Sequence, residues 1–271
     1  MNRNAPIGIF DSGIGGLTVA KAINDILPNE KIIYFGDTAH FPYGDKAAYS
    51  IKHYSALISQ FLLKKGCKSI VIACNTASSV ASKPLVKLLP EGFQLLNVID
   101  PIAKYVADNY SKNKVGVIAT KGTIESRIYP RSIKIIDSSI EVASLATPLL
   151  APMIEEGFFN NTISRTVIAE YLTKKNIKDV EALILGCTHY PLIEKEVKEF
   201  YASNNRAVEI INSANIVAKS VKKALTDREL LAIVPNNNHH FYVSDYTKSF
   251  EKSTKFFFGD ELKLEKMDLW K

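Results

Sequence analysis

Two stretches of the sequence share one pattern, in which an apolar run ends in a cysteine and small polar residues follow. The first reads Ser69-Ile-Val-Ile-Ala-Cys-Asn-Thr-Ala-Ser78, and the second reads Ala182-Leu-Ile-Leu-Gly-Cys-Thr-His-Tyr-Pro191. Short aliphatic runs are typical of buried strands, whereas small polar residues and proline favour the start of a helix. Cys74 and Cys187 are therefore predicted to occupy equivalent strand-to-helix turns.

The rest of the chain alternates between strand-like and helix-like segments. Residues 7–10, 31–36 and 69–73 are apolar strand candidates, and amphipathic helical patterns separate them. This β-α-β-α-β order predicts a parallel sheet covered by helices. Residues 115–119, with the turn from Thr120 to Thr123, repeat the pattern of residues 7–11, and the cysteine turns repeat at a similar offset. Together these repeats predict an internal duplication with a two-fold-like arrangement of the halves.

Composition excludes several classes of protein. With 271 residues, 46% of them hydrophobic and 23% charged, the chain is expected to be globular, as one large domain or two of ordinary size. The apolar runs are too short to cross a membrane and the N-terminus lacks an apolar signal segment, so we expect a cytoplasmic protein. The net charge of +6 is mild, and no basic run is dense enough to indicate nucleic-acid binding.

The three cysteines show neither disulfide-scaffold nor zinc spacing, which predicts free thiols and no metal site. Cys67 follows no motif and is interpreted as a small filler residue. Cys74 and Cys187 differ from it, because a helix N-terminus and nearby cations can lower the pKa of a thiol. Either of them alone is also consistent with a buried structural residue. As a pair in matched turns, they indicate two acid/base groups on opposite sides of one carbon atom.

Other polar residues are predicted to gather around the two thiols, because open α/β sheets bind ligands at the carboxyl ends of their strands. His189 lies two positions after Cys187 and can orient or polarise that thiol. Asp11 can act likewise toward Cys74, although an aspartate there is equally consistent with a turn or cap. Hydroxyl and amide side chains suited to carboxylate and ammonium groups, or to helix capping, are those of Ser12, Asn75, Thr76 and Thr188.

At these residues the sequence resembles the cofactor-independent aspartate/glutamate racemase family. The matching motifs are Gly8-Ile-Phe-Asp-Ser-Gly-Ile-Gly-Gly-Leu-Thr18, Tyr34-Phe-Gly-Asp37, Pro42-Tyr-Gly44, Cys74-Asn-Thr-Ala-Ser78 and Gly186-Cys-Thr-His-Tyr-Pro-Leu192. The first motif and the Pro-Tyr-Gly loop point to the members that act on glutamate. The resemblance implies two pseudo-symmetric α/β domains with parallel sheets and the active site in the cleft between them. We expect residues 1–98 with 213–271 to form one domain and residues 99–212 the other.

The resemblance also implies an activity, namely the interconversion of L- and D-glutamate, with D-glutamate supplied to bacterial peptidoglycan. No cofactor is expected, and the partners implied are the amino acid itself and a second copy of the chain in a homodimer. By analogy, Cys74 takes the α-proton of D-glutamate and Cys187 that of L-glutamate. Asp11 and His189 assist the thiols, and Glu155 or its neighbour Glu156 assists His189. The residues expected to hold the substrate are Asp11, Ser12, Tyr43, Gly44, Asn75, Thr76, Thr120, Thr123, Thr188 and His189.

Three positions depart from the family pattern. His40 and Phe41 stand where relatives usually carry arginine and a smaller residue, Asn212 replaces a usual aspartate, and Ala146 stands where many relatives carry cysteine. None of these positions touches the expected acid/base pair. The substitution before Pro42 is expected to alter loop packing or dimer contacts, and we do not infer a changed substrate from it.

Three other functions compete with this interpretation. The same chemistry on aspartate requires a shorter pocket. A nicotinamide-dependent oxidoreductase fits Gly13-Ile-Gly-Gly16 after a strand and Asp37 after the next one, but Thr18 stands where the third glycine belongs and the paired cysteines have no role in it. An amino-acid sensor using the same cleft predicts ligand binding without turnover and no need for thiols.

Overall fold

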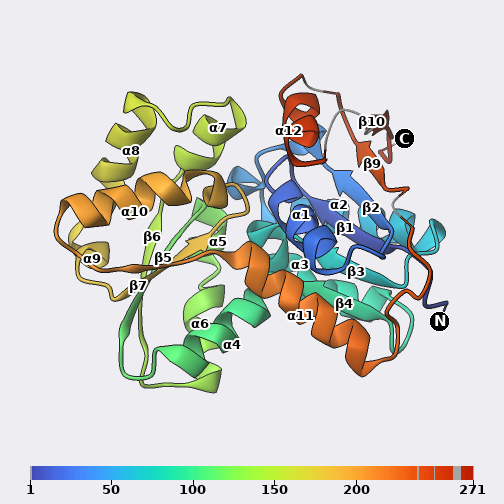
Figure 1. Ribbon diagram of the computed structural model, residues 1–271, viewed down its shortest axis with the longest axis horizontal. Helices are drawn as coiled ribbons and strands as arrows, with labels where there is room; N and C mark the ends of the chain where they lie inside the picture. Colours follow the sequence, from blue (N-terminus) through green and yellow to red (C-terminus); the bar gives the residue numbers. More distant parts are fainter. Residues whose placement is uncertain (1, 237, 247, 259–263, 271) are drawn as a thin grey trace.

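The computed structural model describes residues 2–236, 238–246, 248–258 and 264–270, and it contains two parallel β-sheets flanked by helices (Figure 1). One sheet has six strands in the order β10-β9-β2-β1-β3-β4, and the other has four in the order β6-β5-β7-β8. The strands of the larger sheet are β1 (Ile7–Asp11), β2 (Ile32–Gly36), β3 (Ser69–Ile72), β4 (Gln94–Asn97), β9 (His240–Val243) and β10 (Leu264–Lys266). Those of the smaller sheet are β5 (Lys114–Ala119), β6 (Glu141–Ala146), β7 (Ala182–Gly186) and β8 (Glu209–Ile211).

The two sheets repeat one topology. The order β2-β1-β3-β4 in the first matches β6-β5-β7-β8 in the second, with parallel pairing throughout. The predicted internal duplication is therefore confirmed. The last strands return to the first sheet, because β9 pairs with β2 and β10 pairs with β9.

Helices fill the connections between the strands, as the right-handed crossover of parallel strands requires. Those of the first half and the C-terminal part are α1 (Leu17–Ile26), α2 (Ala48–Lys64), α3 (Asn75–Leu88), α11 (Ser213–Asp227) and α12 (Lys248–Phe258). Those of the second half are α4 (Ile99–Asn109), α5 (Lys121–Glu125), α6 (Ile128–Ile136), α7 (Leu150–Glu155), α8 (Thr162–Leu172), α9 (Lys175–Lys178) and α10 (Glu194–Ser203). Three short 3₁₀ turns are Thr38–His40, Tyr43–Asp45 and Tyr190–Ile193.

Helix α11 joins the two halves. It follows β8 of the smaller sheet and packs along α1 of the larger one, with a further contact to α4 (Figure 1). Val217, Val221 and Leu225 recur every four residues on one face and are fully buried in a core that includes side chains of both sheets. Helix α11 therefore packs against helices of both halves. We propose that residues 1–98 with 213–271 form one domain and that residues 99–212 form the other.

A buried ion pair lies at the N-terminal end of β3, at the opposite end of the strand from the cysteine turn. Lys68, just before β3, donates to Glu30 Oε2 at 2.5 Å, to Arg3 O at 2.6 Å and to Leu230 O at 2.8 Å. Both side chains are almost fully buried, and the second carboxylate oxygen of Glu30 accepts from the Ala232 backbone. All three ammonium donors are used, so the pair ties the N-terminal segment and the segment after α11 to the first sheet.

Replacing Lys68 by methionine is predicted to lower the free energy of unfolding by about 3–5 kcal/mol, because Glu30 would be left as a buried charge without its partner. Urea denaturation measures this loss. The control is Lys104→Met, which removes an exposed pair with Asp108 and is expected to cost less than about 0.5 kcal/mol. Equal losses in the two variants would contradict the role given to Lys68.

Candidate active site

The site is assembled from the carboxyl ends of four strands, two in each sheet. Strand β1 ends at Asp11 and its neighbour β3 leads to Cys74, whereas β5 leads to Thr120 and its neighbour β7 leads to Cys187. These strand ends meet across the two halves, because Thr76 on α3 hydrogen-bonds Thr120 at 2.9 Å. The duplicated topology thus brings the two cysteine turns toward each other.

Cys74 is the N-cap residue of α3, and its thiol is buried. The Ala77 backbone N–H donates to Cys74 Sγ at 3.5 Å, and Ser12 Oγ lies 3.7 Å from the same sulfur. Burial and the charge of Asp11 raise the pKa of the Cys74 thiol well above its usual range, and the hydrogen bonds from Ala77 and Ser12 only partly oppose them. The sequence had indicated that a helix start could lower this pKa, so for Cys74 that expectation was wrong, and the group rests as a thiol.

Cys187 lies in a different electrostatic environment. Its sulfur is 3.7 Å from His189 Nδ1, and His189 Nε2 is hydrogen-bonded to Glu155 Oε2. Burial by itself lowers the pKa of His189, but the charge of Glu155 and the interaction with Cys187 outweigh it, and the pKa lies well above its usual value. His189 is therefore an imidazolium near neutral pH, with an N–H directed at the Cys187 sulfur.

Glu155 rather than Glu156 is the partner of His189. Glu155 is the last residue of α7 and turns its half-buried carboxylate toward the imidazole, whereas Glu156 is exposed. The sequence alone left the choice between these neighbours open. The ring of Phe41 lies against His189 with 5.6 Å between ring centroids, and it covers the charged pair from the side of the Pro-Tyr-Gly loop.

Asp11 is fully buried at the junction of the two halves. Its Oδ2 accepts from the Gly16 backbone at 2.7 Å and from Thr188 Oγ1 at 3.5 Å. Burial raises the pKa of Asp11, opposed by the charge of His189 and by hydrogen bonds from the Gly16 and Ser12 backbones. The Gly15–Gly16 turn requires glycine, because a Cβ on Gly16 would lie 2.4 Å from the Asp11 side chain.

Three threonines and one glycine close the other side of the site. Thr76, Thr120 and Thr123 lie within 2.9–3.3 Å of one another through their hydroxyl oxygens. A Cβ on Gly44 would be 2.8 Å from Thr120 Cβ, so this contact across the halves requires glycine. The neighbouring Tyr43 is buried, and its hydroxyl donates to Asp37 Oδ2 at 2.6 Å.

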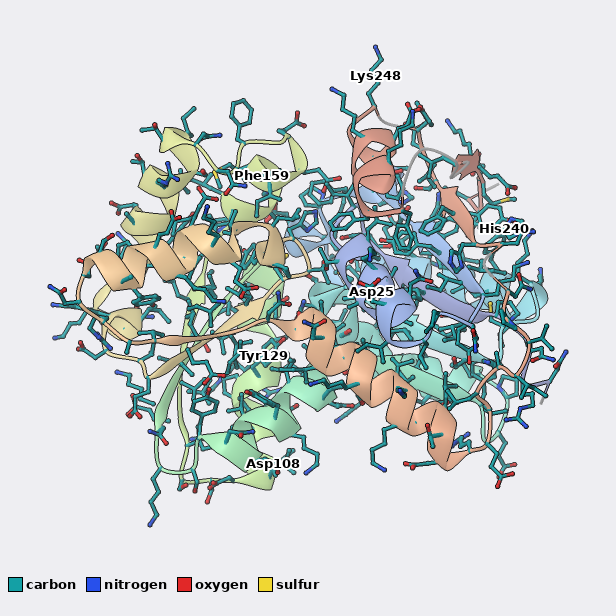
Figure 2. The ribbon with its side chains drawn as sticks, viewed as in Figure 1. Asp25, Asp108, Tyr129, Phe159, His240 and Lys248 are labelled. Carbon is teal, nitrogen blue, oxygen red and sulfur yellow. The ribbon has the colours of Figure 1, made fainter. Side chains whose placement is uncertain are left out.

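Two buried polar atoms of this site have no hydrogen-bond partner within the described part of the chain. They are Asp11 Oδ1 and Asn75 Nδ2. Tyr129, labelled in Figure 2, donates to Asn75 Oδ1 at 2.6 Å and thereby fixes the amide with its NH₂ group unused. Buried polar atoms are almost always hydrogen-bonded, so an unused acceptor and an unused donor at one site indicate a polar ligand. An ammonium group suits Asp11, and a carboxylate suits Asn75.

Some residues of the site carry no local signal in the sequence. Tyr129 on α6 and Phe41 are recognisable only once the halves are folded together. Thr18 was noted only as a missing glycine, yet its hydroxyl donates to Thr188 O at 3.0 Å and so fastens α1 to the second cysteine turn. Gly13, Phe41 and Glu155 also pack closely, because a Cβ on Gly13 would be 3.1 Å from the Phe41 ring.

The departures from the family pattern are accommodated without disturbing the thiols. His40 stacks on Tyr54 with ring centroids 4.0 Å apart and hydrogen-bonds Asp37 at 2.9 Å. Asn212 caps α11 by accepting from the Ala214 backbone at 3.0 Å, which is the role an aspartate would have there. His40 therefore has packing and hydrogen-bond partners of its own in the loop before Pro42.

The geometry gives Asp37 a role other than ribose binding. Its carboxylate is fully buried and accepts from Tyr43, His40 and Ser244 Oγ, the last at 2.7 Å. A carboxylate whose oxygens already accept these hydrogen bonds is not available to a dinucleotide.

Among the described residues, no group of three His, Cys, Asp or Glu side chains is arranged to hold a metal ion. Within the same residues, no helix combines the length and apolar character needed to cross a membrane.

Comparison with known proteins gives the class. The family model "Asp/Glu/Hydantoin racemase" matches residues 9–221, and the chain belongs to this family. The glutamate racemase of Geobacter metallireducens is 40% identical over 257 residues, which are 94% of this chain and 93% of that protein.

Two solved structures show the range of similarity. The crystal structure of glutamate racemase from Francisella tularensis, in complex with D-glutamate, superposes with a TM-score of 0.90 at 39% identity, covering 99% of both chains. The aspartate racemase of Picrophilus torridus matches with a TM-score of 0.57 at 21% identity, covering 84% of this chain and 99% of that one. The second likeness concerns the fold alone.

Removing the negative charge next to His189 is predicted to lower the pKa of its imidazole. In Glu155→Gln the burial that lowers the pKa persists, whereas the charge of Glu155 that raises it is lost, so the pKa of His189 falls. NMR titration of the imidazole ring protons measures the change, and Glu156→Gln is the matched control, expected to titrate like the wild type. An unshifted titration in Glu155→Gln would show that another group sets the charge of His189.

Proposed function

We propose that the chain interconverts L-glutamate and D-glutamate without a cofactor, using Cys74 and Cys187 as the two acid/base groups. The observation that carries this proposal is the placement of two buried thiols at equivalent strand ends of two halves that face each other. One thiol then serves each face of the α-carbon. Relatives named glutamate racemase match nearly the whole chain, which supports glutamate as the substrate.

The two thiols are proposed to exchange one proton each per turnover. Starting from L-glutamate, Cys187 accepts the α-proton as a thiolate, so the Cα–H bond breaks and an S–H bond forms. Cys74, which rests as a thiol, then breaks its S–H bond and delivers its proton to the opposite face of the carbanion. The reverse reaction starts from the Cys74 thiolate and uses the same groups in the opposite roles, as microscopic reversibility requires.

The charged neighbours are proposed to make these roles accessible. The His189 imidazolium, held by Glu155, stabilises negative charge on the Cys187 sulfur. Asp11 and Ser12 face Cys74, where the carboxylate favours the protonated thiol and the hydroxyl can donate to a thiolate. The two thiols thus have charged neighbours of opposite sign, His189 beside Cys187 and Asp11 beside Cys74.

Substrate binding is proposed to use the unsatisfied atoms of the site. The α-ammonium group would approach Asp11 Oδ1, and a carboxylate would accept from Asn75 Nδ2, two buried atoms of the site that lack partners among the described residues. Burial also strengthens the electrostatic stabilisation of a carbanion, which has no electron sink here. Further hydroxyl, ring and backbone groups proposed to hold the substrate are those of Ser12, Tyr43, Gly44, Thr76, Thr120, Thr123, Thr188 and His189.

The cellular context follows from the same proposal. D-Glutamate is a component of bacterial peptidoglycan, so the enzyme would supply cell-wall synthesis. We propose that it acts in the cytoplasm, where the thiols its mechanism needs stay reduced. A homodimer is proposed by analogy with the family.

Serine in place of either proposed catalytic cysteine is predicted to reduce racemisation of glutamate by at least about 100-fold, because a hydroxyl is a far weaker base than a thiolate. Polarimetry or circular dichroism follows the reaction, with no cofactor added. Cys67→Ser is the matched control. That cysteine is buried at the far end of β3, where burial raises its pKa to about 12, so its replacement should leave turnover unchanged.

Aspartate is predicted to be a poor substrate, since the aspartate racemases match this chain only distantly. Rates with both amino acids, measured under the same conditions, decide the question. Faster racemisation of aspartate would replace the substrate but keep the two-thiol mechanism. Binding of glutamate without turnover would instead favour a sensor, and full activity in both serine variants would refute the acid/base assignment.

A further inference from the structure

A groove lies on the second half of the molecule, between helix α6 and strand β6. It encloses about 570 Å³, a volume within the usual range of small-molecule sites. None of its lining residues belongs to the proposed active site. The lining residues used below are Arg127, Lys134, Val142 and Ser144.

Two cations without ion-pair partners line this groove. Arg127 and Lys134 are exposed, and neither forms a salt bridge within the part of the chain that is described. Arg127 is the N-cap residue of α6 and Lys134 lies seven positions further along the chain, which corresponds to about 10 Å along the helix axis. The acidic residue of the lining, Glu141, is paired with Lys114 at 3.4 Å, so it does not neutralise them. The groove therefore carries uncompensated positive charge at two points.

The backbone at Arg127 is held in an unfavourable conformation. Its φ of 55° and ψ of 27° lie in the left-handed region, which costs a residue other than glycine about 1–2 kcal/mol. The turn that Arg127 makes between α5 and α6 places its side chain at the groove. Such strain persists only where the surrounding structure enforces it.

The wall opposite α6 adds an unused polar group and an apolar surface. Ser144 Oγ is buried, lies on this wall and has no hydrogen-bond partner among the described residues. Val142 is half-buried and adds an apolar side chain to the lining.

We propose that this groove binds a small organic bisphosphate, with one phosphate at Arg127 and the other at Lys134. Guanidinium and ammonium groups are the usual phosphate ligands of proteins, and the guanidinium can make two parallel hydrogen bonds to one phosphate. The carbon skeleton lies along Val142. The site is independent of the racemase activity proposed above.

Isothermal titration calorimetry at low ionic strength tests the site, with fructose 1,6-bisphosphate as the probe and fructose 6-phosphate as its single-phosphate comparison. The wild type is expected to bind the bisphosphate at least about tenfold more tightly, because the second charged contact adds to the first. Arg127→Ala and Lys134→Ala should each remove that advantage. Added NaCl should weaken binding, because the contacts are exposed to solvent.

Arg131→Ala is the matched control, because Arg131 is an exposed arginine of the same helix that does not line the groove. It should bind both probes as the wild type does. All three positions are exposed, so the variants are expected to fold normally, which circular dichroism checks. Absence of binding, equal affinity for the two probes, or equal weakening by Arg131→Ala would overturn the proposal.

Discussion

The site depends on keeping an imidazolium and two carboxylates buried beside two thiols. A buried charge is costly unless it is paired and hydrogen-bonded. His189 meets that condition through Glu155, and Asp11 meets it through the Gly16 backbone and Thr188. Thr188 reaches Asp11 from the other half, whereas His189 and Glu155 belong to one half, as do Asp11 and Gly16. The contact between the halves therefore completes the hydrogen bonding of Asp11. The closed, largely dry environment that racemisation requires is thus built into the fold.

Duplication places the two thiols equivalently, but their surroundings are not equivalent. Cys74 has a carboxylate near it and rests protonated, whereas Cys187 has an imidazolium near it. A symmetrical scaffold therefore carries an asymmetric pair, in which one group is ready to donate and the other faces a cation. Two-base racemisation needs this difference in every turnover, because one group must be an acid while the other is a base.

The sequence predicted those parts of the fold whose signal lies within one short stretch of residues. The runs before Cys74 and Cys187 are fully buried strands, and their periodicity and length predicted both turns. Strands β4 and β6 were not predicted, because they are short or half-exposed and lack a continuous apolar run.

The partner of His189 could not be chosen between two adjacent glutamates, since only the fold of α7 decides which one points inward. The contact of Tyr129 with Asn75 joins two helices of different halves and leaves no local signal. The direction of the Cys74 pKa shift was also beyond sequence reasoning, because burial and Asp11 outweigh the helix start.

The most direct test of the two-thiol mechanism is the fate of the α-proton in deuterated water. The wild-type enzyme is incubated with L-glutamate, and both enantiomers are analysed by mass spectrometry early in the reaction. Two groups on opposite faces predict that the D-glutamate formed carries deuterium at Cα, while the remaining L-glutamate keeps its proton. D-Glutamate that retains the original proton would mean that a single group serves both faces, which would contradict the account.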